Sequence, residues 1–152
     1  MALFLSTFEN KIDKKGRVSV PAQFRASLSG QGFHGVVVYE SFVNDCVEGC
    51  DMSRIQQFSE SIDNLDPFSE SRDALATTIL GCAVQLPFDG DGRIILPENL
   101  ISKAKVESKA IFVGKGRTFE IWNPQGFEEY LVKSKALAKE NLNQLKLKKS
   151  GE

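Results

Sequence analysis

The chain has 152 residues, of which 41% are hydrophobic and 26% charged, and its formal net charge is −1. This length suits one compact domain or two small halves that share a core, and the net charge gives no general support for nucleic-acid binding. No apolar run approaches the ~20 residues that a membrane-spanning helix needs, and the N-terminal segment lacks the features of a signal peptide. Three cysteines fit a reducing cytoplasm better than a disulfide framework.

The charged residues are distributed unevenly along the chain. Residues 1–39 have a net charge of +3 and residues 101–152 a net charge of +5, whereas residues 40–73 have −7 and residues 74–100 have −2. An acidic middle therefore lies between basic ends. Any surface that binds anions has to be local and made by particular loops.

The first predicted element is a β-hairpin. Residues 8–12 and 18–20 alternate apolar and polar side chains, and the turn-forming run 13–16 lies between them. Gly16 suits a positive φ in this turn. Pro21 ends the second strand, and proline is tolerated where it can begin the helix that follows.

The rest of the chain predicts further strands and helices in a regular order. Asp51 and Ser69 are polar residues able to cap the two middle helices, and Asp66-Pro67 separates these helices. A last helix begins near residue 127, and a lysine-rich tail over 141–152 is expected to fray. The other predicted spans are a helix at 22–28, strands at 35–39 and 46–50, helices at 54–65 and 69–80, strands at 83–88 and 94–96, a helix from 97, and strands at 110–114 and 118–122.

The pattern of residues 13–21 returns 76 positions later, at residues 89–97. Each half then has a hairpin, a helix, two strands and a helix, and a unit of about 48 residues is too small to bury an adequate core alone. The sequence therefore predicts an α+β, mainly β fold in which two halves related by a pseudo-twofold axis form one intertwined barrel. The equivalent residues are Asp13 and Asp89, Gly16 and Gly92, Arg17 and Arg93, and Pro21 and Pro97.

The two hairpin tips differ in charge, because the first carries Lys14 and Lys15 where the second carries Gly90 and Asp91. An aspartate and an arginine four positions apart can form a surface ion pair worth only about 0–1 kcal/mol, so a purely structural turn is one interpretation. In the functional interpretation the cations face DNA, because a two-stranded ribbon fits the major groove and arginine can bind a guanine edge. The candidate DNA contacts are Arg17, Lys14, Lys15 and Arg93, and the candidate loop-shaping residues are Asp13, Gly16, Asp89 and Gly92.

Other candidate sites are weaker. A zinc site could be formed by Cys46, Cys50, Cys82 and His34. The spacing of Cys46 and Cys50 is poor for a structural zinc pair, so buried thiols without a metal are the favoured interpretation. The acidic run at 89–92 lacks the further acidic ligands of a calcium loop. We expect no metal, no cofactor and no enzymatic activity.

Several motifs together resemble the MraZ family. The Asp-x-x-x-Arg motifs at 13–17 and 89–93, each followed by apolar-x-apolar-Pro, look like the paired motifs of that family. So do the Thr-Thr-Ile-Leu-Gly run at 77–81 and the stretch at 113–122. The resemblance covers almost the whole chain.

This resemblance implies both a fold and a function. Members of the family are bacterial transcriptional regulators, expected in the cytoplasm and at the nucleoid, that assemble into homo-oligomeric rings. They bind short direct repeats upstream of the division and cell-wall gene cluster. By this resemblance, Arg17 is the residue of the first motif that is expected to contact DNA. Several hairpins on one ring would bind evenly spaced repeats at high effective concentration. The implied units are two SpoVT–AbrB-like swapped-hairpin repeats at 7–54 and 83–126, a helical connector at 55–82, and a C-terminal helix and tail at 127–152.

Two other classes of function stay open from the residues alone. The first is a ring-forming structural or protein-interaction module that binds partners through its acidic middle segment, and such a module would retain no DNA at low salt. The second is a small hydrolase, whose activity would survive loss of all the cations at the tips.

Overall fold

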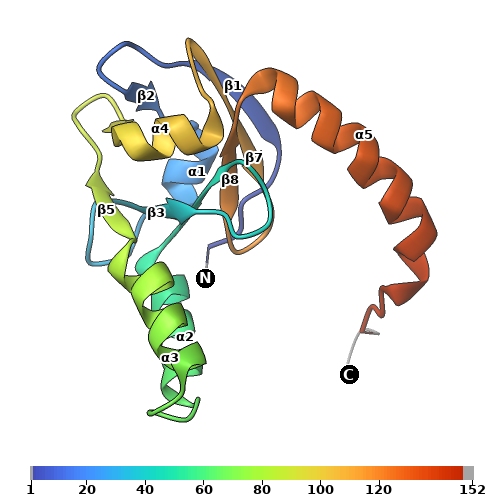
Figure 1. The fold of residues 1–152 in the computed structure, drawn as a ribbon. Coiled ribbons are helices and arrows are strands. Elements are labelled where there is room, and N and C mark those ends of the chain that lie inside the picture. The colour runs from blue at the N-terminus through green and yellow to red at the C-terminus, as the bar shows by residue number, and fades with distance from the viewer. Residues whose placement is uncertain (1, 149–152) are drawn as a thin grey trace.

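The computed structural model describes residues 2–148, which form a six-stranded antiparallel sheet, a two-stranded ribbon and several helices. The strands are β1 (Thr7–Lys11), β2 (Arg17–Ser19), β3 (Gly35–Glu40), β4 (Val47–Cys50), β5 (Val84–Pro87), β6 (Arg93–Ile95), β7 (Lys109–Gly114) and β8 (Phe119–Trp122). The helices are α1 (Ala22–Ser27), α2 (Met52–Asp63), α3 (Glu70–Leu75), the π-helical turn η1 (Ala76–Gly81), α4 (Glu98–Ala104), α5 (Pro124–Asn141) and the 3₁₀ turn η2 (Leu142–Gln144). Figure 1 shows a body of strands from which two helical arms extend, one made by α2 and α3 and the other by α5.

The strand order interleaves the two halves of the chain. The six-stranded sheet has the order β1-β7-β8-β4-β3-β5, and β2 pairs with β6 in the separate ribbon. When each strand of the first half is exchanged with its equivalent in the second half, β1 with β5 and so on to β4 with β8, the same order results in reverse. Neither half therefore forms its sheet alone.

The pairing of the first hairpin differs from the sequence prediction. Beyond the turn, the backbone pairing between the first two strands is limited to an isolated bridge between Ile12 and Val18, beside a 2.7 Å hydrogen bond from the Asn10 side chain to the Ser19 carbonyl. Instead, β1 pairs with β7 and β2 pairs with β6. Burial explains the difference, because pairing β2 with β6 places Val18 and Ile94, each 1% exposed, against the core. The described strands form two sheets and do not close into the single barrel expected from the sequence.

The main hydrophobic core draws on both halves. Four phenylalanine rings meet at its centre, with contacting ring centroids between 5.0 and 6.4 Å apart. Phe4 and Phe24 come from the first half and Phe112 and Phe119 from the second, and each is at most 1% exposed. Separation of the halves would therefore expose aromatic surface on both sides, which is strongly unfavourable in water.

The two predicted middle helices are present and are capped as expected. Asp51 accepts a hydrogen bond from the backbone N–H of Arg54 (2.9 Å) at the start of α2, and Ser69 accepts one from Arg72 (3.1 Å) at the start of α3. The second of these helices is α-helical only as far as Leu75 and continues as η1. Together, α2 and α3 form an arm that projects from the body (Figure 1).

The C-terminal helix begins at Pro124, three residues earlier than predicted. Asn123 caps it by accepting a hydrogen bond from the backbone N–H of Gly126 (3.0 Å), and proline is favoured in the first turn of a helix. Tyr130 stacks on Trp122 of β8, with ring centroids 4.6 Å apart. These contacts attach the first turns of α5 to the sheet.

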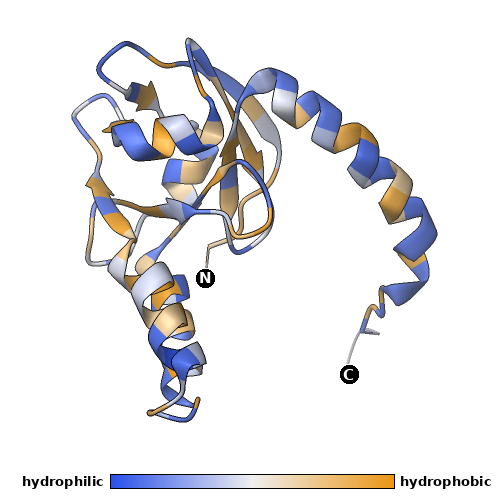
Figure 2. Ribbon diagram, viewed as in Figure 1, coloured by the Kyte–Doolittle hydropathy of each residue, from blue (hydrophilic) through white to orange (hydrophobic). Residues whose placement is uncertain are grey.

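The remainder of this C-terminal arm is largely exposed. No side chain of Pro124–Asn141 is fully buried, and Figure 2 shows mainly hydrophilic residues along α5 with apolar ones at intervals. Of the tail predicted to fray, Leu142–Gln144 forms one helical turn, and residues 149–152 lie outside the described part of the chain. Within residues 2–148, no helix combines the length and the apolar character needed to cross a membrane.

Candidate nucleic-acid interface

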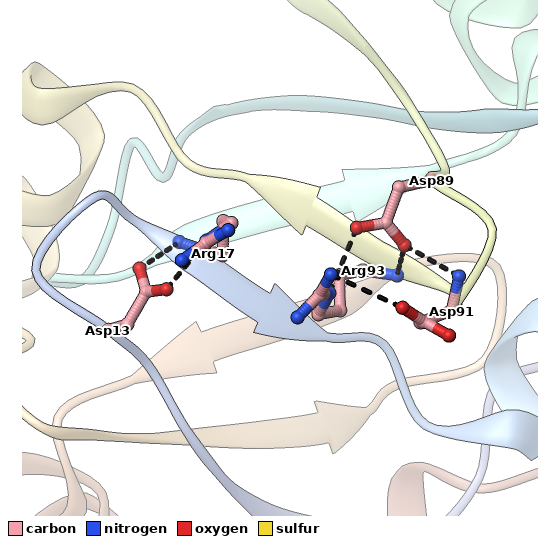
Figure 3. Close-up of polar contacts among 5 residues, drawn as sticks. All are labelled: Asp13, Arg17, Asp89, Asp91 and Arg93. Atoms are coloured by element: carbon pink, nitrogen blue, oxygen red, sulfur yellow. Dashed lines mark hydrogen bonds and ion pairs between the residues drawn. The ribbon is translucent and has the colours of Figure 1, made fainter.

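The Asp13 carboxylate organises the first hairpin tip. Its Oδ1 atom accepts hydrogen bonds from the backbone N–H groups of Lys15 and Arg17, both at 2.9 Å, and its Oδ2 atom accepts one from Arg17 Nε at 2.6 Å. The turn is closed by a bond of 3.0 Å from the Gly16 N–H to the Asp13 carbonyl. One carboxylate thus holds both the loop backbone and the arginine side chain (Figure 3).

The second tip repeats this arrangement with one addition. Asp89 Oδ1 accepts from the backbone N–H groups of Asp91 (2.8 Å) and Arg93 (3.0 Å), and Asp89 Oδ2 accepts from Arg93 Nε (2.9 Å). In addition, Arg93 Nη2 donates to Asp91 Oδ2 at 3.3 Å. Within residues 2–148 the guanidinium of Arg17 bonds only to Asp13, so its terminal nitrogens are less engaged than those of Arg93 (Figure 3).

These hydrogen bonds also influence protonation. The backbone N–H of Arg17 is the main cause that lowers the pKa of Asp13, and the backbone N–H of Arg93 likewise lowers the pKa of Asp89. The side-chain bond to Asp89 raises the pKa of Arg93. Both aspartates therefore stay ionised at neutral pH, and each holds a cationic guanidinium in a fixed position.

The β2–β6 ribbon connects the two tips through one outer face. Its register pairs Arg17 with Ile95, Val18 with Ile94, and Ser19 with Arg93. Val18 and Ile94 face the core, and because side chains alternate along a strand, the other four residues share the outer face. The two arginines therefore lie at opposite ends of one exposed surface (Figure 3). Figure 1 shows both tips on the side of the body away from α5.

The two loop glycines lock each tip against the other half. Gly16, with φ +86°, accepts a 2.9 Å hydrogen bond at its carbonyl from the Leu96 N–H, and a Cβ at this glycine would lie 2.6 Å from the Leu96 carbonyl oxygen. Gly92, with φ +75°, leaves room for Arg25 of α1, whose Nη1 would lie 2.5 Å from a Cβ there. Sequence reasoning missed Arg25, because only the fold brings this helical residue to the second tip.

Both halves of the chain match the same family model. This model, described as "MraZ protein, putative antitoxin-like", matches residues 3–77 and residues 79–148. The chain belongs to the MraZ family. It is 53% identical over 140 residues to the transcriptional regulator MraZ of Rickettsia felis, with 92% of this chain and 94% of that relative covered. It is 52% identical over 146 residues to the protein of the same name from Pelagibacter ubique, with 96% and 93% covered.

Membership of the MraZ family confirms the resemblance seen in the sequence motifs. The two separate matches also fit the predicted internal repeat. The relatives are named as transcriptional regulators, which agrees with the prediction that the chain is not an enzyme.

The structure places the weaker candidate ligands of this MraZ chain in separate environments. Cys46 packs beside Ile111 and Trp122 in one buried cluster, Cys50 lies in another, and Cys82 is exposed. Burial raises the pKa of both buried thiols to about 12, so they remain protonated. In the acidic run at residues 89–92, the candidate calcium loop, the Asp89 carboxylate already accepts hydrogen bonds from its own loop.

Proposed function

We propose that this protein is a transcriptional regulator that binds double-stranded DNA through the outer face of the β2–β6 ribbon and its two tip loops. The observation that carries the proposal is a pair of aspartate-held arginines on one exposed two-stranded ribbon. A ribbon of this kind fits the major groove of B-DNA. The names of the relatives support the regulatory part of the proposal.

The hydrogen bonds of Arg17 support a role in reading bases. Asp13 binds the guanidinium at Nε and the side chain is 40% exposed. Among the described residues neither terminal nitrogen has a hydrogen-bond partner, so both are available for the bidentate contact that arginine makes with guanine O6 and N7. The positions of Arg17 and Arg93 differ by two residues along the ribbon, or about 6.8 Å. This spacing corresponds to roughly two base-pair steps of 3.4 Å.

The first tip is expected to contribute most of the affinity. Lys14 and Lys15 are exposed beside Arg17 and can contact phosphates. At the second tip, Asp91 repels phosphate and also occupies a terminal nitrogen of Arg93. Asp13, Gly16, Asp89 and Gly92 act as loop-shaping residues and not as direct contacts.

The proposal extends to architecture and to target. The repeats at 7–54 and 83–126 would be two swapped-hairpin units, which the cross-pairing of β1 with β7 and of β3 with β5 supports. Copies of the chain would form a ring at the nucleoid and bind direct repeats upstream of the division and cell-wall gene cluster. Exposed apolar side chains at Val132 (68%), Leu137 (58%) and Leu145 (66%) are suited to contact a neighbouring copy.

Affinity measurements on direct-repeat promoter DNA test this function, with Arg17→Ala and Arg93→Ala as a matched pair. Loss of a bidentate contact costs roughly 1–3 kcal/mol, or about 5- to 150-fold in affinity, and we expect the larger loss for Arg17→Ala. Replacing Lys14 and Lys15 together by alanine should flatten the salt dependence by up to about 1.8 in log–log slope for each bound hairpin.

Three outcomes would contradict the proposal. Unchanged binding by Arg17→Ala would remove this residue from the interface, and a salt-independent affinity would exclude phosphate contacts. A protein that forms a stable oligomer in light scattering but retains no DNA at low salt would instead be a structural or interaction module.

A further inference from the structure

Ile95 is an apolar side chain on the outer face of the β2–β6 ribbon. It is 59% exposed, whereas its neighbours Ile94 and Leu96 are 1% and 2% exposed. Single exposed apolar residues are common on protein surfaces, so its position is what matters. Ile95 lies directly opposite Arg17 in the register of the ribbon, and such pairs have Cβ atoms about 4.5–5.5 Å apart on the same face.

The equivalent position in the first half holds Ser19, which lies opposite Arg93. One end of the outer face therefore combines an arginine with an isoleucine, and the other combines an arginine with a serine. The more basic tip, with Lys14 and Lys15, adjoins the isoleucine end, because Arg17 belongs to both. The strand pairing is the same in both halves, but the side chains on the outer face differ between the two ends of the ribbon.

We propose that Ile95 is a specificity-determining residue that contacts the 5-methyl group of a thymine. This inference rests on the proposed DNA-binding function. In the major groove thymine alone among the four bases presents a methyl group, and apolar side chains recognise it by contact. An isoleucine beside a guanine-reading arginine is therefore placed to read the next part of the site. Because Ser19 cannot make the same contact, Ile95 also fixes the direction in which the ribbon lies on DNA.

The test uses the full-length protein and a DNA site selected from genomic fragments. Each thymine in the site is replaced in turn by deoxyuridine, which lacks the methyl group but keeps the same hydrogen-bonding edge. We expect wild-type affinity to fall about fourfold at one thymine position in each bound element, the effect of losing one buried methyl-sized group. Ile95→Ser should bind the thymine and uracil sites equally, and Ile95→Val should still discriminate.

Several results would overturn the inference. Wild-type protein that binds the site sequence-specifically but tolerates every uracil would exclude a thymine-methyl contact while leaving the proposed function intact. Ile95→Ser that still discriminates would assign the methyl contact to another residue, and a lower oligomer mass for this variant without altered discrimination would make Ile95 an assembly residue. Absence of any DNA binding by the wild type would overturn both the inference and the proposed function. Thermal unfolding of Ile95→Ser verifies that this exposed substitution leaves the fold intact.

Discussion

Arg17 and Arg93 occupy equivalent positions in the two halves, yet their guanidinium groups have different surroundings. Asp13 holds Arg17 through Nε, whereas Asp89 and Asp91 together hold Arg93 through Nε and Nη2. An arginine with one terminal nitrogen engaged within its own loop has fewer donors for a guanine edge. A single side chain, that of Asp91, therefore accounts for the difference in hydrogen bonding between the two guanidinium groups.

Replacing Asp91 by alanine should strengthen DNA binding. The change removes one negative charge from the tip and frees Arg93 Nη2, and an exposed pair of this kind is worth up to about 1 kcal/mol, or about fivefold in affinity. Fluorescence anisotropy with labelled promoter DNA measures the effect. Asp73→Ala removes the same charge from α3, outside the ribbon, and should leave affinity nearly unchanged; equal gains from both variants would point to net charge alone.

At the scale of elements, the pairing of β4 with β8 sets two glutamates directly opposite each other at the centre of the sheet. Glu120 is 1% exposed and accepts hydrogen bonds from Lys115 Nζ (3.2 Å) and Trp122 Nε1 (2.9 Å). Burial raises the pKa of Glu48, and the charge of Glu120 adds to this effect. The Tyr39 side chain, opposite Glu48 on β3, lowers the Glu48 pKa but does not cancel the effect of burial. The central strand pair therefore holds two carboxylates side by side, and the raised pKa of Glu48 reflects this conflict.

Glu48→Gln should stabilise the fold at neutral pH by roughly 0.2–1 kcal/mol, because like charges directly opposite on paired strands are unfavourable. A raised folded-state pKa means that the folded protein holds this proton more tightly than the unfolded chain. The stability that protonated Glu48 contributes is therefore fully present below its unfolded-state pKa and is lost as pH rises through its folded-state pKa. The advantage of the variant should therefore shrink as pH falls through the raised folded-state pKa of Glu48, and should be gone below about 4.3, the ordinary glutamate pKa.

Urea unfolding across this pH range measures the difference between the variant and the wild type. Glu40→Gln, at the exposed end of β3, is the matched control because Val47 lies opposite it in the register. A variant Glu48→Gln that is less stable than the wild type at pH 7 would show that the carboxylate makes a favourable contact.

At the scale of the whole molecule, the two halves form one cooperative unit. Each strand of the first half pairs with at least one strand of the second, and the central aromatic cluster takes two rings from each half. Covalent continuity between α2 and α3 contributes no strand pairing and no part of this aromatic cluster. Stability therefore resides in the interface between the halves more than in the connection.

A chain cut between α2 and α3 should remain intact as a complex. A protease site introduced beside Phe68, which is 95% exposed, allows cleavage after folding. We expect the two fragments to co-elute in size-exclusion chromatography with unchanged circular dichroism, and each fragment expressed alone to lack a cooperative unfolding transition. Fragments that separate in native buffer, or that fold individually, would contradict the shared core.

The sequence predicts the elements better than their partners. The alternation of apolar and polar side chains predicts the strands, and the capping residues Asp51 and Ser69 predict the starts of the middle helices. Both signals depend only on nearby residues. The partner of β2 does not follow from such local patterns, since a tight turn also suits a simple hairpin. Ile95 escaped notice for the same reason, because only the pairing with β6 shows that it shares a face with Arg17.

The connector between the two halves has a consequence for how the binding surface can vary. If this strand arrangement were made by two identical chains, every substitution would occur twice, and equivalent positions would always hold the same residue. Within one chain, Lys15 and Asp91, or Ser19 and Ile95, vary independently on a shared scaffold. Because the two halves are linked in one chain, a symmetric backbone can present different side chains at its two tips, and a substitution at one tip need not alter the other.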